Sequence, residues 1–119
     1  MTLKTTLTTG LFAAFAAFPA FADDMKVVAS FSILGDMVEQ VVGDHAEVTT
    51  LVGPDADAHV YQPSVADARA VAEADVIFVN GMGLEPWSDT LIAESGTDGT
   101  VYVATEGVTP VLVDGEIDP

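Results

Sequence analysis

The sequence contains no cysteine among its 119 residues. No disulfide can therefore stabilise the fold, which has to rely on its apolar core. The absence also excludes thiolate metal ligands, cysteine nucleophiles and a lipid anchor attached through a cysteine.

Positive charge is nearly as scarce. Three lysines and arginines stand against 19 aspartates and glutamates, which gives a formal net charge of -16. Nucleic-acid binding needs a basic surface and is excluded. A negative field attracts cations at long range, although a protein that is merely very soluble would carry the same charge.

Long apolar runs are also missing, because no uncharged apolar run reaches the about 20 residues that a membrane-spanning helix needs. The apolar run over residues 11–21 follows Lys4 and ends in Ala-Phe-Ala. These features are typical of a secretory signal peptide at residues 1–22. We expect residues 23–119 to be a soluble periplasmic chain without membrane insertion after cleavage.

After this leader, the hydrophobic pattern alternates between strands and helices. Strands are predicted at residues 26–31, 46–52, 75–80, 100–105 and 108–113, and helices at 33–42, 65–74 and 86–95. Gly43 and Gly96 are predicted to end the first and third helices, and Ser64 with Asp67 is predicted to cap the start of the second. Pro110 marks the last strand as an edge strand, because it cannot donate a hydrogen bond. The β-α order with short connections predicts an α/β fold, with an open, mainly parallel sheet and helices on both faces.

Two loops of this predicted sheet are candidates for a binding site. Residues 53–63 leave the carboxyl end of the second strand, and residues 80–87 leave that of the third. Ligands of open parallel sheets bind at the carboxyl ends of the strands. We therefore expect both loops to share one functional edge.

His59 is the main candidate residue. Imidazole is the commonest metal ligand, and Pro54 and Pro63 limit the freedom of the loop that carries this histidine. The pattern alone leaves open that His59 is an ordinary surface histidine. His45 follows the helix stop at Gly43, and we expect it at the opposite edge without a function.

Other site patterns fail. Asp55-x-Asp57-x-His59 resembles the start of a calcium loop, but neither the glycine nor the glutamate of that loop follows. The glycines after the third strand lack the third glycine of a dinucleotide motif. Glu85 is expected at the solvated surface, with a general acid as the weaker alternative. Trp87 is expected to pack its helix on the sheet, with a role in lining a cleft as the alternative.

Three segments together resemble a known family. They are VVASFSILGDMVEQVVGD, LVGPDADAHVYQPSVADA and ADVIFVNGMGLEPW, at residues 27–44, 51–68 and 74–87. Their order and spacing are similar to the N-terminal lobe of the zinc/manganese-type periplasmic substrate-binding proteins of metal ABC transporters (cluster A-I). The chain departs from the family pattern at Ala58, where proline often stands, and at Gln62, where an acid is common.

The resemblance implies two α/β lobes, joined by a long helix, that hold one divalent metal between them. His59 matches the first metal ligand of the family. The next ligand would follow the last residue of this chain, so we expect residues 23–119 to be the N-terminal lobe of a truncated protein, with the linking helix and C-terminal lobe absent.

The function implied is capture of a divalent transition metal, zinc in preference to manganese, for delivery to the membrane permease of an ABC importer. No reaction is catalysed in this interpretation. The alternative is a small secreted enzyme, or a partner-binding half-domain, that uses the Glu85 and Trp87 edge.

Overall fold

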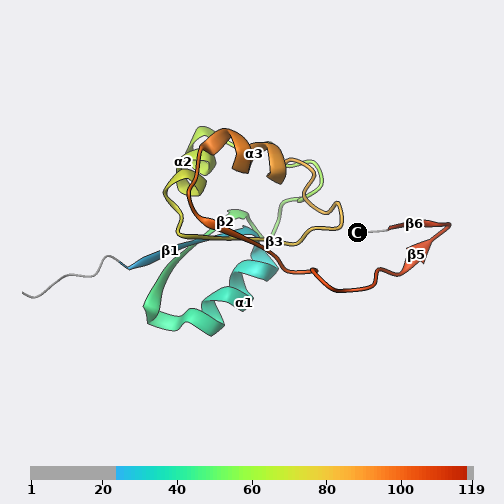
Figure 1. Cartoon of the computed structure of the whole chain (residues 1–119), viewed down its shortest axis with the longest axis horizontal. Coiled ribbons are helices and arrows are strands. Elements are labelled where there is room, and N and C mark those ends of the chain that lie inside the picture. Colours follow the sequence, from blue (N-terminus) through green and yellow to red (C-terminus); the bar gives the residue numbers. More distant parts are fainter. Residues whose placement is uncertain (1–23, 118–119) are drawn as a thin grey trace, which may run out of the picture.

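The computed structural model of the chain describes residues 24–117, so the predicted signal peptide at residues 1–22 lies outside the described part. Four parallel strands form one sheet in the order β2-β1-β3-β4 (Figure 1). The strands are β1 (Met25–Phe31), β2 (Ala46–Val52), β3 (Val76–Val79) and β4 (Thr100–Val103). The predicted α/β fold with an open parallel sheet is confirmed.

Helices cover both faces of this sheet, as predicted (Figure 1). They are α1 (Ser32–Val42), α2 (Val65–Glu73) and α3 (Ser88–Ser95), and a short 3-10 helix, η1 (Gly43–His45), precedes β2. Helix α1 lies on one face, whereas α2 and α3 lie side by side on the other. The strand order explains this division. The connection from β1 to β2 moves across the sheet in one direction, and those from β2 to β3 and from β3 to β4 move in the other. Because right-handed crossovers in opposite directions lie on opposite faces, α1 is separated from α2 and α3.

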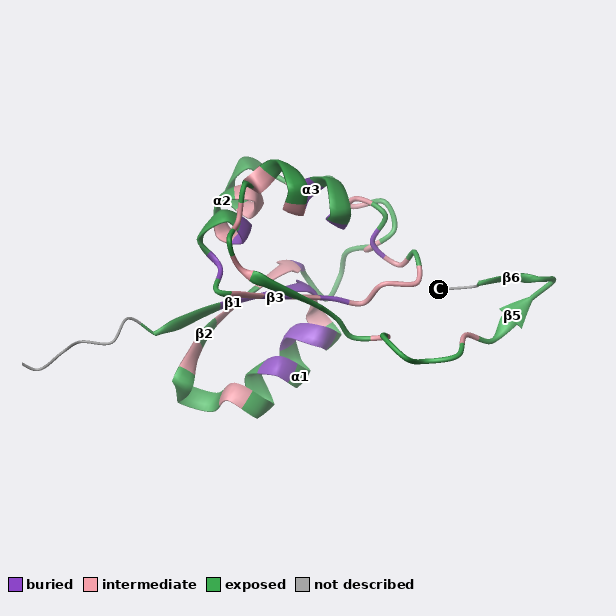
Figure 2. Ribbon diagram, in the orientation of Figure 1, coloured by how far each residue is buried: buried purple, intermediate pink, exposed green. Residues whose placement is uncertain are grey.

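The core lies mainly between the sheet and the pair α2 and α3. Its buried residues come from two central strands, these two helices and the residue after α2. They are Val28, Val71, Ala74, Ile77, Val79 and Leu91. Figure 2 shows further buried residues in α1, on the other face of the sheet. Strand β1 has four consecutive buried residues, 27–30, which confirms that it is buried on both faces.

The predicted helix ends are confirmed at α1 and α2. Gly43 follows α1 with a positive φ of 53°, and its N–H donates to the carbonyl of Glu39. Ser64 and Asp67 form a complete capping box at the start of α2, with each side chain accepting from the other residue's backbone N–H. Loop 53–63 therefore ends at a well-defined helix start.

Two element predictions need correction. Helix α3 begins at Ser88 and not at Pro86, because Glu85 opens a turn in which its carbonyl accepts from the Ser88 N–H at 3.1 Å. The predicted strand at residues 108–113 does not extend the sheet. Only β5 (Leu112–Val113) is formed, and it pairs antiparallel with β6 (Glu116–Ile117) in a separate hairpin.

The hairpin has a local physical cause. Asp114 and Gly115 both have positive φ, 53° and 88°, which is the backbone of a tight hairpin turn. The hairpin extends away from the main sheet (Figure 1). No helix within residues 24–117 combines the length and the apolar character that crossing a bilayer requires.

The face of the sheet that carries α1 is only partly covered. A groove of about 380 Å³ runs between α1 and β4, and the stacked rings of Phe78 and Tyr102 form part of its wall. Every residue of β4 is exposed. The cluster of buried residues therefore lies on the α2 and α3 side, whereas the α1 side keeps an open groove.

Ile77→Ala tests this assignment of the core. Ile77 is 2% exposed in β3, so we expect the substitution to lower the free energy of unfolding by about 2–5 kcal/mol. Ile33→Ala is the matched control, because Ile33 is 63% exposed and should change stability by less than about 0.5 kcal/mol. Urea unfolding followed by circular dichroism measures both, and equal losses would contradict the assignment.

Candidate metal site

Loops 53–63 and 80–87 meet at the carboxyl edge of the sheet, as predicted. The indole Nε1–H of Trp87 donates to the carbonyl of Ala58 at 2.6 Å. The rings of Tyr61 and Trp87 lie 5.3 Å apart, centroid to centroid, with a tilt of 59°. Residues 29 positions apart in the chain thus form one continuous edge, which we call the rim.

His59 lies on this rim next to a carboxylate. Asp57 Oδ1 accepts from the His59 backbone N–H at 2.9 Å and lies 3.1 Å from the ring nitrogen Nδ1. The His59 side chain is 44% exposed. With the proton on Nδ1, the ring donates to Asp57 and Nε2 keeps the lone pair that a metal needs.

The contact with His59 also affects Asp57. The backbone N–H of His59, and then its ring, hold the pKa of Asp57 below the ordinary value of an aspartate. Asp57 therefore stays ionised down to lower pH than a free aspartate, and the acceptor for Nδ1–H is present throughout the neutral range.

A complete metal site is not present in the described part of the chain. No group of three or more histidine, aspartate, glutamate or cysteine side chains in residues 24–117 could hold a metal ion. His45 lies in η1, directly before β2, and is exposed. It is therefore at the amino end of that strand, away from His59, as expected.

The prediction that Glu85 is solvated is wrong. Glu85 is only 4% exposed, and its Oε1 accepts from Ser30 Oγ at 2.6 Å and from the Asn80 N–H at 2.5 Å. Its Oε2 accepts from the Gly81 N–H at 3.2 Å. The Asn80 and Gly81 amides belong to the loop after β3, which turns sharply, with positive φ at Gly81, Met82 and Gly83.

This turn leaves no room for other residues at Gly81. A Cβ atom added there would contact the Val103 side chain, and its φ of 82° favours glycine. The sequence pattern of residues 80–83 predicts a loop but does not show where its backbone amides point. Buried backbone amides need a hydrogen-bond acceptor, and Glu85 provides it.

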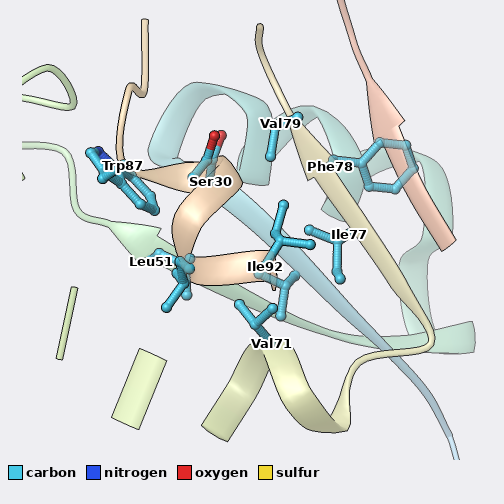
Figure 3. A pocket seen from close by; sticks show the side chains of 11 residues that line it. Ser30, Leu51, Val71, Ile77, Phe78, Val79, Trp87 and Ile92 are labelled. Carbon is cyan, nitrogen blue, oxygen red and sulfur yellow. The ribbon is translucent and has the colours of Figure 1, made fainter. Parts of the chain in front are cut away.

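Trp87 packs against the core, in agreement with the packing prediction. It contacts the cluster of buried residues under α2 and α3. Figure 3 shows it with Ser30, Leu51 and Ile92 around a cavity of about 10 Å³. This space is at most large enough for one water molecule, so it is not a substrate pocket.

Tyr61 and Asp67 are rim residues that sequence reasoning did not select. The Tyr61 hydroxyl donates to Asp67 Oδ2 at 2.9 Å, and the same oxygen accepts from the Ser64 N–H and hydroxyl. Burial, and then the Asp67 contact, raise the pKa of Tyr61, so its hydroxyl stays protonated and donates. The capping box predicted for Ser64 and Asp67 could have indicated this acceptor.

The fold and the rim define an open α/β lobe in which two loops are joined at the carboxyl edge of a parallel sheet. Residues 27–119 match the ZnuA family, described as the periplasmic component A of a zinc-uptake complex. The chain belongs to this family. The resemblance expected from sequence is confirmed.

Individual relatives are named for different metals. The chain is 38% identical to the manganese-binding lipoprotein MntA of Halalkalibacterium halodurans, over 82% of this chain and 33% of MntA. It is 39% identical to the iron-binding protein YfeA of Yersinia pestis, over 77% of this chain and 29% of YfeA. This chain thus spans about a third of the length of these relatives.

A solved structure agrees with the fold. The manganese-bound periplasmic metal-binding protein of Candidatus Liberibacter asiaticus superposes with a TM-score of 0.73 and 34% identity. The match covers 82% of this chain and 37% of that one. The described fold therefore matches one part of that solved structure.

Glu85→Gln tests the buried carboxylate. The amide would present an NH₂ group to inward-pointing N–H donors, so we expect a loss of about 1–3 kcal/mol in the free energy of unfolding. Glu94→Gln makes the same change at an exposed site of α3 and should have little effect. Thermal and urea unfolding compare the two, and a stability of Glu85→Gln equal to that of Glu94→Gln would contradict the role of this carboxylate.

Proposed function

We propose that this chain is the N-terminal lobe, residues 23–119, of an extracytoplasmic solute-binding protein that captures a divalent transition metal for an ABC importer. A leader at residues 1–22 and a membrane permease as partner belong to the same proposal. The observation that carries it is the placement of His59 on the rim, with Nδ1 facing Asp57, in a chain of the ZnuA family.

In this proposal Nε2 of His59 coordinates the metal. A carboxylate that accepts from the other ring nitrogen orients a ligating imidazole and makes it more basic, which is the arrangement that Asp57 supports. One imidazole cannot bind zinc tightly, because protein sites use three or four ligands. In this proposal the second ligand comes from the segment that would follow residue 119, and the remaining ligands come from the C-terminal lobe of the complete protein.

The composition supports a cationic cargo. The formal charge of -16 raises the local concentration of cations and disfavours anionic solutes. Zinc ahead of manganese is our prediction for the metal, because imidazole suits zinc better than manganese. The relatives named for manganese and iron make elemental analysis of the purified protein the direct test of this preference.

The alternative function, an enzyme or partner-binding half-domain centred on Glu85 and Trp87, has little support. Both oxygens of Glu85 accept hydrogen bonds within the lobe, and the cavity beside Trp87 is about 10 Å³. Neither side chain offers a reactive group to a substrate. We therefore propose binding and no reaction.

His59→Ala in the complete protein should weaken zinc and manganese binding by orders of magnitude. Its thermal stability without metal should not change, because the His59 side chain is 44% exposed. Isothermal titration calorimetry with His45→Ala as the matched control measures this. Unchanged affinity in His59→Ala would refute the assignment of His59.

Asp57→Asn should weaken metal binding about 10–100-fold, because it replaces the carboxylate that orients Nδ1–H. Asp55→Asn is the matched control, since it removes one charge from the same exposed loop. Competition against a chelating dye compares the two variants. Equal losses would mean that Asp57 acts only through its charge.

A further inference from the structure

We infer that Trp87 is a positioning residue for His59, and that its indole N–H sets where loop 53–63 presents the imidazole. This inference rests on the proposed function of His59 as a ligand. It goes beyond the packing role of Trp87, because it concerns one hydrogen bond and not the apolar contact of the ring.

Loop 53–63 has few other attachments to the lobe. Within residues 24–117 its backbone makes one turn hydrogen bond, from the Ala56 N–H to the Gly53 carbonyl at 3.2 Å, and one bond to its own Asp57 side chain. The Tyr61 hydroxyl joins the loop to Asp67 in the adjacent α2. The only hydrogen bond from this loop to an element beyond α2, in the described part of the chain, is that from Trp87 Nε1 to Ala58. Its acceptor is the carbonyl of the peptide unit that contains the His59 nitrogen.

Trp87 is itself fixed from two sides. Its ring lies against the buried core, and its backbone carbonyl accepts from the Leu91 N–H at 3.1 Å in the first turn of α3. The donor that meets Ala58 is therefore part of a rigid element. A rigid donor that is 2.6 Å from its acceptor restricts the loop more than a flexible surface side chain would.

A second contact supports the same geometry. The Tyr61 ring lies on Trp87, and its hydroxyl is held by Asp67, the capping residue of α2. His59 thus stands between two residues, Ala58 and Tyr61, that are both attached to Trp87. We call these contacts the Trp87 clasp.

The physical consequence concerns pre-organisation. A metal site loses affinity when its ligands have to be ordered during binding, because the entropy of ordering subtracts from the binding free energy. The clasp orders the His59 loop beforehand. Removal of the single N–H should therefore weaken metal binding without altering the core.

The test replaces only the N–H of Trp87. Incorporation of L-β-(benzothien-3-yl)alanine at position 87 of the complete protein keeps the shape of the ring and removes the donor. We expect about tenfold weaker binding of Zn²⁺ and Mn²⁺, similar in size to loss of an outer contact to a ligand. Tyr102→Phe, on the other face of the sheet, is the aromatic control and should bind normally.

A structural readout accompanies the affinity. In ¹⁵N-histidine-labelled protein without metal, the His59 amide should exchange faster and its ring resonances should shift, while those of His45 stay unchanged and the melting temperature is preserved. A merely structural role for Trp87 would lower the melting temperature and affect both histidines.

The outcomes separate this inference from the proposed function. If the variant without the indole N–H binds metal with wild-type affinity while His59→Ala loses binding, the clasp is overturned and the proposed function is intact. If His59→Ala binds metal normally, the proposed function fails, and the His59 resonances still decide whether the clasp positions this residue. In that case, His59 resonances that are unchanged in the variant without the indole N–H would overturn the clasp.

Discussion

The buried carboxylate of Glu85 is the contact on which the rim depends. It accepts hydrogen bonds from Ser30 at the end of β1 and from the Asn80 and Gly81 amides after β3. Two adjacent parallel strands are thereby joined at their carboxyl ends by one side chain. Charge-assisted hydrogen bonds of this kind are stronger than neutral ones, and a buried carboxylate requires them.

From this carboxylate the order of the rim extends outward. Glu85 opens the turn that places Trp87, and Trp87 contacts Ala58 and Tyr61 in the loop after β2. Each step fixes a side chain further from the core, until the exposed imidazole of His59 is reached. A half-exposed side chain such as that of His59 can thus be positioned through contacts that lead back to a core it does not touch.

The two faces of the sheet contribute unequally to this arrangement. The α2 and α3 face is sealed by apolar contacts that include Trp87, so it supports the rim directly. The α1 face keeps an open apolar groove beside Phe78 and Tyr102. Large exposed apolar patches on proteins mark contact surfaces, so this groove is a candidate contact surface of the lobe.

The sequence by itself determined the order of the first four strands and the three helices, the capping box at Ser64, the shared edge of the two loops and the place of His59 on that edge. These depend on local periodicity, turn chemistry and the rule that parallel strands end at one edge. The helix start at Ser88 and the separate hairpin of residues 112–117 escaped prediction, because both are decided by turns with particular backbone angles.

Only the tertiary structure decided the role of Glu85, the bond from Trp87 to Ala58 and the link from Tyr61 to Asp67. The side chain of Glu85 meets Ser30, which is 55 residues away, and the Trp87 indole meets a carbonyl 29 residues away. Sequence patterns report which face of an element is apolar, but not which distant donor an acceptor will meet. That depends on how the strands are aligned in the folded sheet.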